Sequence, residues 1–245
     1  MSIWGKVIGG VAGFAVSGPL GAILGAVAGH QVDKMRGGNN FTGSDKNARH
    51  VAFTTAVIVL SAKMAKADGV VTRDEVETFK KLFHISPDEM KNVGRLFDEA
   101  KKEASGFEPY AEQIAMMFAH EPVVMEELMG GLFHVAKADG RIHPDEITYL
   151  ANIAQTFGFT EHQFERLKTI HLGTDDETDA YEVLDLNREA SDEEIKKRYR
   201  ELIREHHPDT LIAKGVPQEF VDLANDKMAA INTAYDRIEK DRGLR

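Results

Sequence analysis

The chain has 245 residues, enough for one large domain or two ordinary ones, and its 42% hydrophobic and 29% charged residues are globular proportions. Its formal net charge of −10 argues against a general nucleic-acid-binding protein, because phosphate contacts need concentrated lysine and arginine. The absence of cysteine excludes disulfide scaffolds, thiol chemistry and cysteine-ligated zinc, and it fits a reducing compartment. Helix-forming residues dominate and no run alternates apolar and polar residues, so an all-α fold is expected.

An uncharged, glycine-rich stretch begins the chain. No residue from Val7 to Gly29 is charged, and a helix of this length would cover about 34 Å, enough for a bilayer core of about 30 Å. Residues 1–32 are therefore predicted to be a transmembrane anchor. Gly21, Gly25 and Gly29 recur at every fourth residue, which would let two helices approach closely in lipid and form a homodimer. Glycines that only tolerate local packing are the alternative.

Two other interpretations of this stretch remain open. Ala26-Val27-Ala28 resembles a signal-peptidase site, and Ser17-Gly18-Pro19 is typical of a turn between two short helices of a re-entrant hairpin. The charges that follow the stretch are mostly positive over the next twenty residues, whereas Lys6 stands alone before it. The positive-inside rule then predicts a single pass with the bulk of the chain in the cytoplasm.

The middle of the chain contains an internal repeat. Residues 33–50 are polar and rich in glycine and asparagine, as expected of a linker. Beyond them, Ala65-Lys66-Ala67-Asp68-Gly69 recurs at residues 136–140, and an Asp-Glu pair follows each copy at the same spacing. Each copy ends one apolar-periodic helix (52–67 and 124–138) and precedes another. Residues 51–173 are therefore predicted to form a pseudo-twofold helical bundle. Its expected core includes Phe79, Leu82, Phe83, Ile147, Leu150 and Ile153.

Capping boxes mark the expected helix starts. In this pattern, a serine or threonine and a glutamate or glutamine three residues later satisfy the free N–H groups of a first helical turn. The pairs are Thr72–Glu75, Ser86–Glu89, Thr160–Gln163 and Ser191–Glu194. Pro144 is well suited to be the first residue of a helix.

The repeat also has the spacing of the second half of an EF-hand loop. A true EF-hand is excluded, because methionine, valine and lysine stand where its first calcium ligands would be. Asp68, Glu75, Asp139 and Glu146 would form a looser cation site if the two copies face each other. Turn formation by Asp-Gly and helix capping by the glutamate explain the same spacing, and the sequence favours this simpler interpretation. No cofactor is expected.

The repeat resembles the TerB-like domain, an all-helical module found in tellurite-resistance proteins and in a membrane-bound J-protein. The resemblance extends from about Ala52 to Leu172 and is carried by the two Ala-Lys-Ala-Asp-Gly segments. It implies an interaction or sensing module with no known reaction.

Residues 174–245 are predicted to form a small helical domain. A helix opened by Ser191 has an apolar stripe, and a second stripe lies beyond a loop that bears Pro208, Gly215 and Pro217. The first stripe is Ile195, Tyr199, Leu202, Ile203 and His206; the second is Phe220, Leu223, Ala224, Met228, Ile231, Tyr235 and Ile238. Two such helices are expected to pack as an antiparallel hairpin that Tyr181, Val183 and Leu184 close on one side.

The loop contains His207-Pro208-Asp209 directly after a basic amphipathic helix. Together with the Tyr-x-Val-Leu opening and the Ile-Asn-x-Ala-Tyr pattern at 231–235, this motif resembles the J-domain family from Asp179 onward. The resemblance implies that the partner is an Hsp70-type chaperone such as DnaK, that its ATPase is stimulated, and that His207, Pro208 and Asp209 contact it.

The helix before the motif carries basic residues that the same resemblance assigns to Hsp70 binding. Lys196, Lys197, Arg200 and Arg204 would place positive charge against an acidic Hsp70 surface and aid encounter and orientation. An ordinary solvated helix face is the alternative. Glu201 and Thr210 stand where J-domains often carry basic residues, which leaves the strength of coupling open.

An anchor, a TerB-like domain and a J-domain in this order resemble membrane-anchored members of the DnaJ family. The resemblance implies a co-chaperone in a bacterial inner membrane whose TerB-like domain selects clients or senses envelope stress. The alternative is an ion- or stress-sensing membrane scaffold in which the J-domain is a docking handle. An enzyme is not expected, because the chain lacks a Gly-x-Ser-x-Gly elbow, a P-loop and a His-Glu-x-x-His helix.

Overall fold

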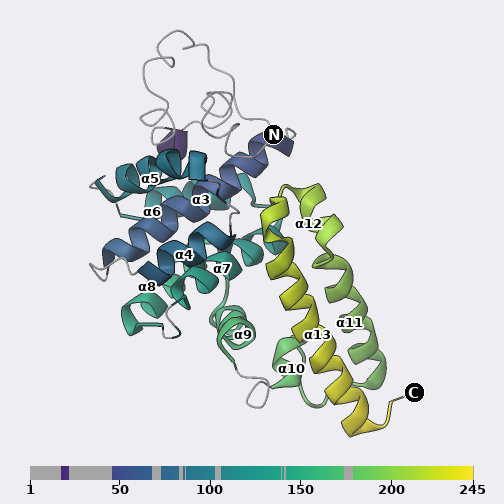
Figure 1. Ribbon diagram of the computed structural model, residues 1–245. Helices are drawn as coiled ribbons and strands as arrows, with labels where there is room; N and C mark the ends of the chain where they lie inside the picture. Colours follow the sequence, from purple (N-terminus) through teal and green to yellow (C-terminus); the bar gives the residue numbers. More distant parts are fainter. Residues whose placement is uncertain are drawn as a thin grey trace.

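A computed structural model describes residues 18–21, 46–67, 73–82, 85, 87–102, 106–138, 140, 142–173 and 179–244. All regular secondary structure in these residues is helical, which confirms the all-α prediction (Figure 1). Within the described ranges, no helix is both long and apolar enough to cross a membrane. Most of the predicted anchor lies outside these ranges.

Residues 18–21 form a short helical turn that packs on the rest of the chain. Gly18 has a φ of +80°, a left-handed conformation that glycine adopts readily, and the predicted turn between two short helices lies largely outside the described residues. Leu20 is fully buried, and its amide N–H donates to Gln113 Oε1 at 2.9 Å. This part of the predicted anchor therefore contacts the helical bundle.

Residues 46–173 form the middle domain, a bundle arranged around one central helix. Its helices are α3 (Lys46–Ala67), α4 (Arg73–Leu82), α5 (Pro87–Lys102), α6 (Glu108–Met117), α7 (Pro122–Ala136), α8 (Pro144–Thr156) and α9 (Glu161–Leu172). Every side chain from Ala52 to Met64 of α3 is buried, and α3 packs against α5, α6, α7 and α8. Apart from Lys63, the side chains of this stretch are apolar or small, and a helix of this kind is expected to occupy such a central position. Because α3 begins at Lys46, it includes the last residues of the predicted linker.

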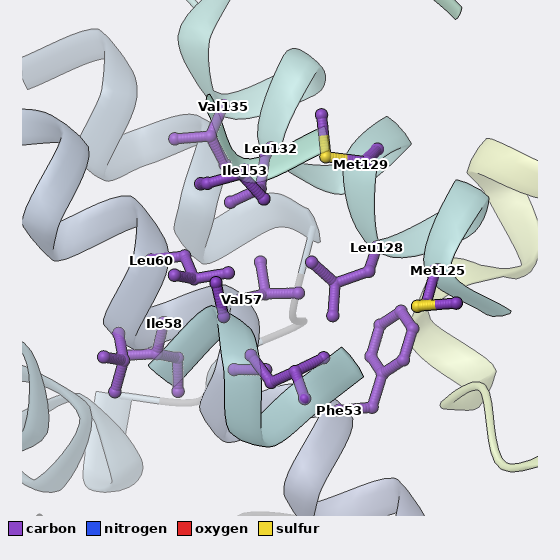
Figure 2. Packing of buried hydrophobic residues seen from close by; sticks show 14 of the residues in the cluster. Phe53, Val57, Ile58, Leu60, Met125, Leu128, Met129, Leu132, Val135 and Ile153 are labelled. Carbon is purple, nitrogen blue, oxygen red and sulfur yellow. The ribbon is translucent and has the colours of Figure 1, made fainter. Parts of the chain in front are cut away.

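The core of the middle domain draws on all of its helices, and α3 and α7 both contribute many of its buried side chains. Figure 2 shows the labelled residues of α3 (Phe53, Val57, Ile58, Leu60) opposite those of α7 (Met125, Leu128, Met129, Leu132, Val135). Of the predicted core, Phe79, Leu150 and Ile153 are buried and Ile147 is half-buried against them. The side chains of Leu82 and Phe83 lie outside the described set.

Two of the four predicted capping boxes can be checked, and both are formed. Gln163 N–H donates to Thr160 Oγ1 at 3.2 Å, and Glu194 N–H donates to Ser191 Oγ at 3.3 Å. In each box the later side chain accepts from the backbone N–H of the first residue. Pro144 is the first residue of α8, as predicted. Thr72 and Ser86 lie outside the described residues.

Residues 179–244 form the C-terminal domain, an antiparallel hairpin with a short helix across one end (Figure 1). Its elements are α10 (Ala180–Val183), α11 (Asp192–Glu205), α12 (Pro208–Lys214), the 3₁₀ turn Gln218–Phe220 and α13 (Val221–Arg242). Ile195 and Leu202 of α11 pack with Ile231 and Ile238 of α13 in a core of their own. The predicted hairpin is confirmed.

The second apolar stripe of this domain serves two cores, and the prediction that all of it closes the hairpin is wrong. Phe220, Leu223 and Ala224 are buried in the core of the middle domain, together with Leu211 of α12. The reason is length. With 22 residues against 14 for α11, α13 is longer by about 12 Å, so its first turns extend past the hairpin and meet α7.

The contact between Gly131 and Phe220 gives a test of this docking. A Cβ at Gly131 of α7 would lie 2.6 Å from Phe220 Cε1, and the Phe220 ring is held from its other side by Phe53 at a centroid distance of 4.8 Å. Overpacking costs about 1–3 kcal/mol and alanine returns up to about 1 kcal/mol of helix propensity. We therefore expect Gly131→Ala to lower the free energy of unfolding by about 1–2 kcal/mol, measured by urea denaturation and circular dichroism.

Gly94 is the matched control for this substitution. It lies inside α5, and a Cβ there would meet no heavy atom within 4 Å. Gly94→Ala should raise the free energy of unfolding by up to about 1 kcal/mol. Equal stabilisation by both substitutions would show that Phe220 does not pack on α7.

Candidate functional site

The His-Pro-Asp motif forms the start of a short helix. His207 is the N-cap of α12 in an extended conformation, Pro208 is its first residue, and Asp209 N–H donates to His207 Nδ1 at 3.2 Å. Proline suits this position because its missing N–H would have no helical partner and its φ is fixed. The sequence placed the motif in a loop. The structure leaves only His206 and His207 between α11 and α12, because Pro208 and Asp209 are the first two residues of α12.

The two polar residues of the motif face solvent. The side chain of His207 is 49% exposed and that of Asp209 is 90% exposed. The hydrogen bond to Asp209 occupies Nδ1 of His207. The other ring nitrogen and the Asp209 carboxylate therefore remain available to a partner.

The basic residues of α11 lead to this turn along one helix face. Lys196, Arg200 and Arg204 are four residues apart; Arg200 and Arg204 are exposed and Lys196 is half-buried. Lys197 is 77% exposed, with its Nζ 4.0 Å from Glu201. Exposed pairs of this kind contribute at most about 1 kcal/mol, so Glu201 reduces the local positive charge without fixing the structure.

The opposite side of the turn is buried against the middle domain. His206, the residue before the motif, is 1% exposed; its Nδ1 lies 3.0 Å from Glu127 Oε1 and its Nε2 3.6 Å from Glu126 Oε2. Lys227 of α13 lies 2.9 Å from Glu126 and 3.1 Å from Glu127. Arg166 of α9 lies 3.5 Å from Glu126 and donates to the carbonyl of Val183 in α10. We call these five charged or titratable residues, Glu126, Glu127, Arg166, His206 and Lys227, the interdomain cluster.

The charges of the interdomain cluster hold its carboxylates ionised. Burial alone would raise the pKa of Glu127, but the Lys227 charge and the hydrogen bond to His206 outweigh it and lower this pKa to about 2. Burial also opposes ionisation of Glu126, where Lys227 and Arg166 lower the pKa to about 2. Burial and then Lys227 lower the pKa of His206. An ionised carboxylate can only accept, so in the hydrogen bond between them His206 Nδ1 donates to Glu127.

Sequence reasoning assigned His206 to an apolar stripe and did not identify the cluster. One local signal was present: Glu126 and Glu127 are adjacent charges in a helix whose neighbouring residues are apolar. Their partners Arg166, His206 and Lys227 are distant in sequence, and no local pattern predicts these pairings.

Comparison with known proteins agrees with the three-part organisation. Residues 1–47 match the transmembrane domain of the co-chaperone DjlA, residues 54–169 match the tellurite resistance protein TerB, and residues 179–242 match the DnaJ domain. Co-chaperone protein DjlA of Shewanella oneidensis is 34% identical, with 100% of both chains aligned. The DjlA protein of Coxiella burnetii is 32% identical to this chain, with 98% of both chains aligned. That of Photobacterium profundum is 30% identical, with 99% of this chain and 100% of the relative aligned.

The chain belongs to the DjlA co-chaperone family. The middle domain is a TerB domain, the C-terminal domain is a J-domain, and the N-terminal match supports membrane anchoring. No solved structure matches the chain significantly.

The other predicted site residues are only partly placed. Glu146 is buried and accepts from His143 N–H at 2.8 Å, the capping role that the sequence favoured. Asp68, Asp139 and the side chain of Glu75 lie outside the described set, and the described residues contain no group of three metal-ligating side chains. The cation site therefore stays a prediction.

The glycine face of the anchor is also largely unplaced. Gly21 lies in the short turn at 18–21 and is half-buried, whereas Gly25 and Gly29 lie outside the described residues. Self-association through these glycines stays a prediction.

A cavity of about 420 Å³ adjoins the interdomain cluster. It is lined from the TerB domain by His134, Lys137 and His171, among others, and from α13 by Leu223, Asp226 and Lys227. The ring of His171 stacks on Phe133, and its Nε2 is buried with no hydrogen-bond partner. Burial, with a smaller effect of Lys227, lowers the pKa of His171 to about 3.

His171 predicts that the folded protein loses stability in mild acid. The ring of His171 stays neutral in the native state, whereas the unfolded chain takes up a proton at this histidine near pH 6.5. The group therefore does not lower the free energy of unfolding above pH 6.5, and it lowers that free energy progressively as the pH drops from 6.5 toward about 3. The loss is at most about 1.4 kcal/mol per pH unit. His171→Phe keeps a ring on Phe133 and removes the titrating group, so the free energy of unfolding should vary less with pH. Urea denaturation between pH 6.5 and 4.5 measures this slope, and an unchanged slope would contradict the assignment.

Proposed function

We propose that this chain is a membrane-anchored J-domain co-chaperone that recruits an Hsp70-type chaperone, DnaK, and stimulates its ATPase through His207, Pro208 and Asp209. The observation that carries the proposal is the His-Pro-Asp turn, which presents two solvent-facing polar residues at the end of a basic helix. The relatives named Co-chaperone protein DjlA, aligned over their full length, support it.

The geometry suits a regulator of another protein's ATPase. Pro208 and the hydrogen bond from Asp209 N–H to His207 fix the turn before any partner binds, so little conformational entropy is lost on binding. Lys196, Lys197, Arg200 and Arg204 would attract an acidic surface and orient it toward the turn. ATP hydrolysis would take place in the partner, and this chain would supply the contact that accelerates it.

The other two parts of the chain would determine where and on what the partner acts. We assign client selection or the sensing of envelope stress to the TerB domain, because it is the large domain that contacts the J-domain directly. The match of residues 1–47 supports a single-pass anchor in a bacterial inner membrane with the bulk of the chain in the cytoplasm. The spacing of Gly21, Gly25 and Gly29 supports a homodimer in that membrane.

The central test is His207→Gln in the full-length chain in detergent micelles. Glutamine retains an acceptor for Asp209 N–H, so α12 should still form, but the imidazole is lost from the exposed face of the turn. We expect the wild-type chain to raise the steady-state ATPase rate of DnaK and the variant to leave it at the basal rate.

His162→Gln is the control, because His162 is another exposed histidine, 68% exposed on α9 of the TerB domain. The His162→Gln variant should stimulate the DnaK ATPase as strongly as the wild-type chain does. A wild-type chain that fails to stimulate at every concentration would refute the proposed function.

The basic face predicts a salt-dependent effect on encounter. Arg200→Ala with Arg204→Ala should raise the concentration needed for half-maximal stimulation by about tenfold at low salt, because electrostatic steering speeds association. The saturating rate should not change. The difference should shrink as salt rises, since the Debye length falls from about 10 Å at 0.1 M to about 3 Å at 1 M.

The matched control removes two exposed basic residues from the far end of α13, Arg237→Ala with Lys240→Ala. The C-terminal end of α13, to which they belong, is remote from α12 (Figure 1), so the half-maximal concentration should stay near that of the wild type. Equal effects of the two double variants would indicate a general charge effect and would remove the role assigned to α11.

A further inference from the structure

The His-Pro-Asp turn is exposed on one side and bound to the TerB domain on the other. His206, the residue before the motif, donates to Glu127 of α7 at 3.0 Å and is 1% exposed. Beyond the motif, Leu211 of α12 is buried in the core of the TerB domain. The residues that flank the motif on both sides are therefore held by the TerB domain.

The carboxylate pair Glu126 and Glu127 on α7 contacts two helices of the J-domain at one place. Glu127 contacts His206 at the end of α11 and Lys227 on α13, two helices that reach the pair from different directions. Glu126 also contacts Lys227, and it contacts Arg166, which donates to the backbone of α10. Since these side chains are mostly buried, removing one leaves the cluster with an unbalanced charge or an unsatisfied hydrogen-bonding group in an apolar setting, which favours rearrangement.

We propose that Glu127, assisted by Glu126, is a positioning residue for the His-Pro-Asp turn, through which the TerB domain sets how strongly the J-domain stimulates its Hsp70 partner. The proposal rests on the co-chaperone function proposed above. Glu127 would not touch the partner. It acts through His206, whose ring fixes the direction in which the backbone leaves α11 and enters the motif.

The arrangement also couples the two binding surfaces of the molecule. A client of the TerB domain that shifts α7 would change the position of His206 and so the activity of the turn. Linkage is reciprocal for binding only: if the client also changes the affinity of the turn for Hsp70, then Hsp70 changes the affinity of the TerB domain for that client by the same factor. The buried cluster is the physical connection between them.

The test compares variants of the full-length chain by saturating DnaK stimulation, half-maximal concentration and amide hydrogen exchange over residues 205–212. Glu127→Ala removes the acceptor of His206 and should lower the saturating stimulation at least about fivefold, the factor that corresponds to about 1 kcal/mol for one lost hydrogen bond. Exchange in the turn should become faster. Glu127→Gln keeps an acceptor for both His206 and Lys227 and should restore most of the stimulation.

Glu121→Gln is the matched control. Glu121 is also a carboxylate that links the two domains, with Oε2 3.2 Å from Lys214 of α12, but it is 24% exposed and does not contact His206. Its removal should leave both stimulation and exchange in the turn near wild-type values. This control separates positioning by Glu127 from the loss of any interdomain ion pair.

A double variant keeps the test valid if Glu127→Ala does not fold. Glu127→Leu with Lys227→Met replaces a buried pair by apolar side chains of similar size, an exchange that is often neutral or stabilising, while Glu126 keeps Arg166. We expect a folded protein with reduced saturating stimulation, because His206 has lost its acceptor.

The outcomes distinguish the two proposals. If the wild type stimulates, His207→Gln does not, and the Glu127→Ala and double variants reach the wild-type saturating rate, the positioning role is refuted and the co-chaperone function stands. A change confined to the half-maximal concentration also refutes positioning. If the wild type itself does not stimulate, the proposed function is wrong and the positioning role is refuted with it.

Discussion

Adjacent carboxylates cannot remain ionised inside a protein unless cations and hydrogen bonds compensate them. Glu126 and Glu127 stand on α7 among apolar neighbouring residues, so their compensation constrains the residues that pack around them. Lys227, Arg166 and His206 provide it from α13, α9 and the end of α11. The J-domain must therefore meet α7 in one orientation, because only that orientation brings both of its own partners, His206 and Lys227, to the pair.

Apolar contact supplies most of the energy of this docking, and the charges supply its geometry. Full burial of Phe220 against Gly131 and Phe53 is worth about 1.5–3 kcal/mol. A buried ion cluster, in contrast, often contributes little net stability, because desolvation offsets attraction. An apolar side chain such as Phe220 tolerates small rotations of the interface, whereas a 3.0 Å contact between His206 and Glu127 does not. Stability and orientation thus come from different residues of the same interface.

Local patterns predicted the features that depend on neighbouring residues. The capping boxes at Thr160 and Ser191 formed as the sequence predicts, and the His-Pro-Asp motif follows closely after the basic helix α11. The α12 helix and the docking were missed, because an apolar stripe indicates that a face is buried but not which core buries it. Phe220 and Ile231 belong to one helical stripe, yet they pack in different domains. The pairing of Glu126 with Lys227 joins residues 101 positions apart, beyond the reach of any periodicity.

A J-domain that packs on the TerB domain holds its Hsp70 partner in one place, whereas a J-domain on a flexible linker would not. On a flexible linker, the position of Hsp70 relative to a client would be spread over the volume that the linker can reach. Here Arg166 donates to the α10 backbone, and α12 and α13 pack on α7, so the turn keeps a fixed place on the TerB domain. A client bound to the TerB domain would then meet the partner at a defined distance and angle. Since His206 lies directly before the motif, a small displacement of α7 is enough to disturb that alignment.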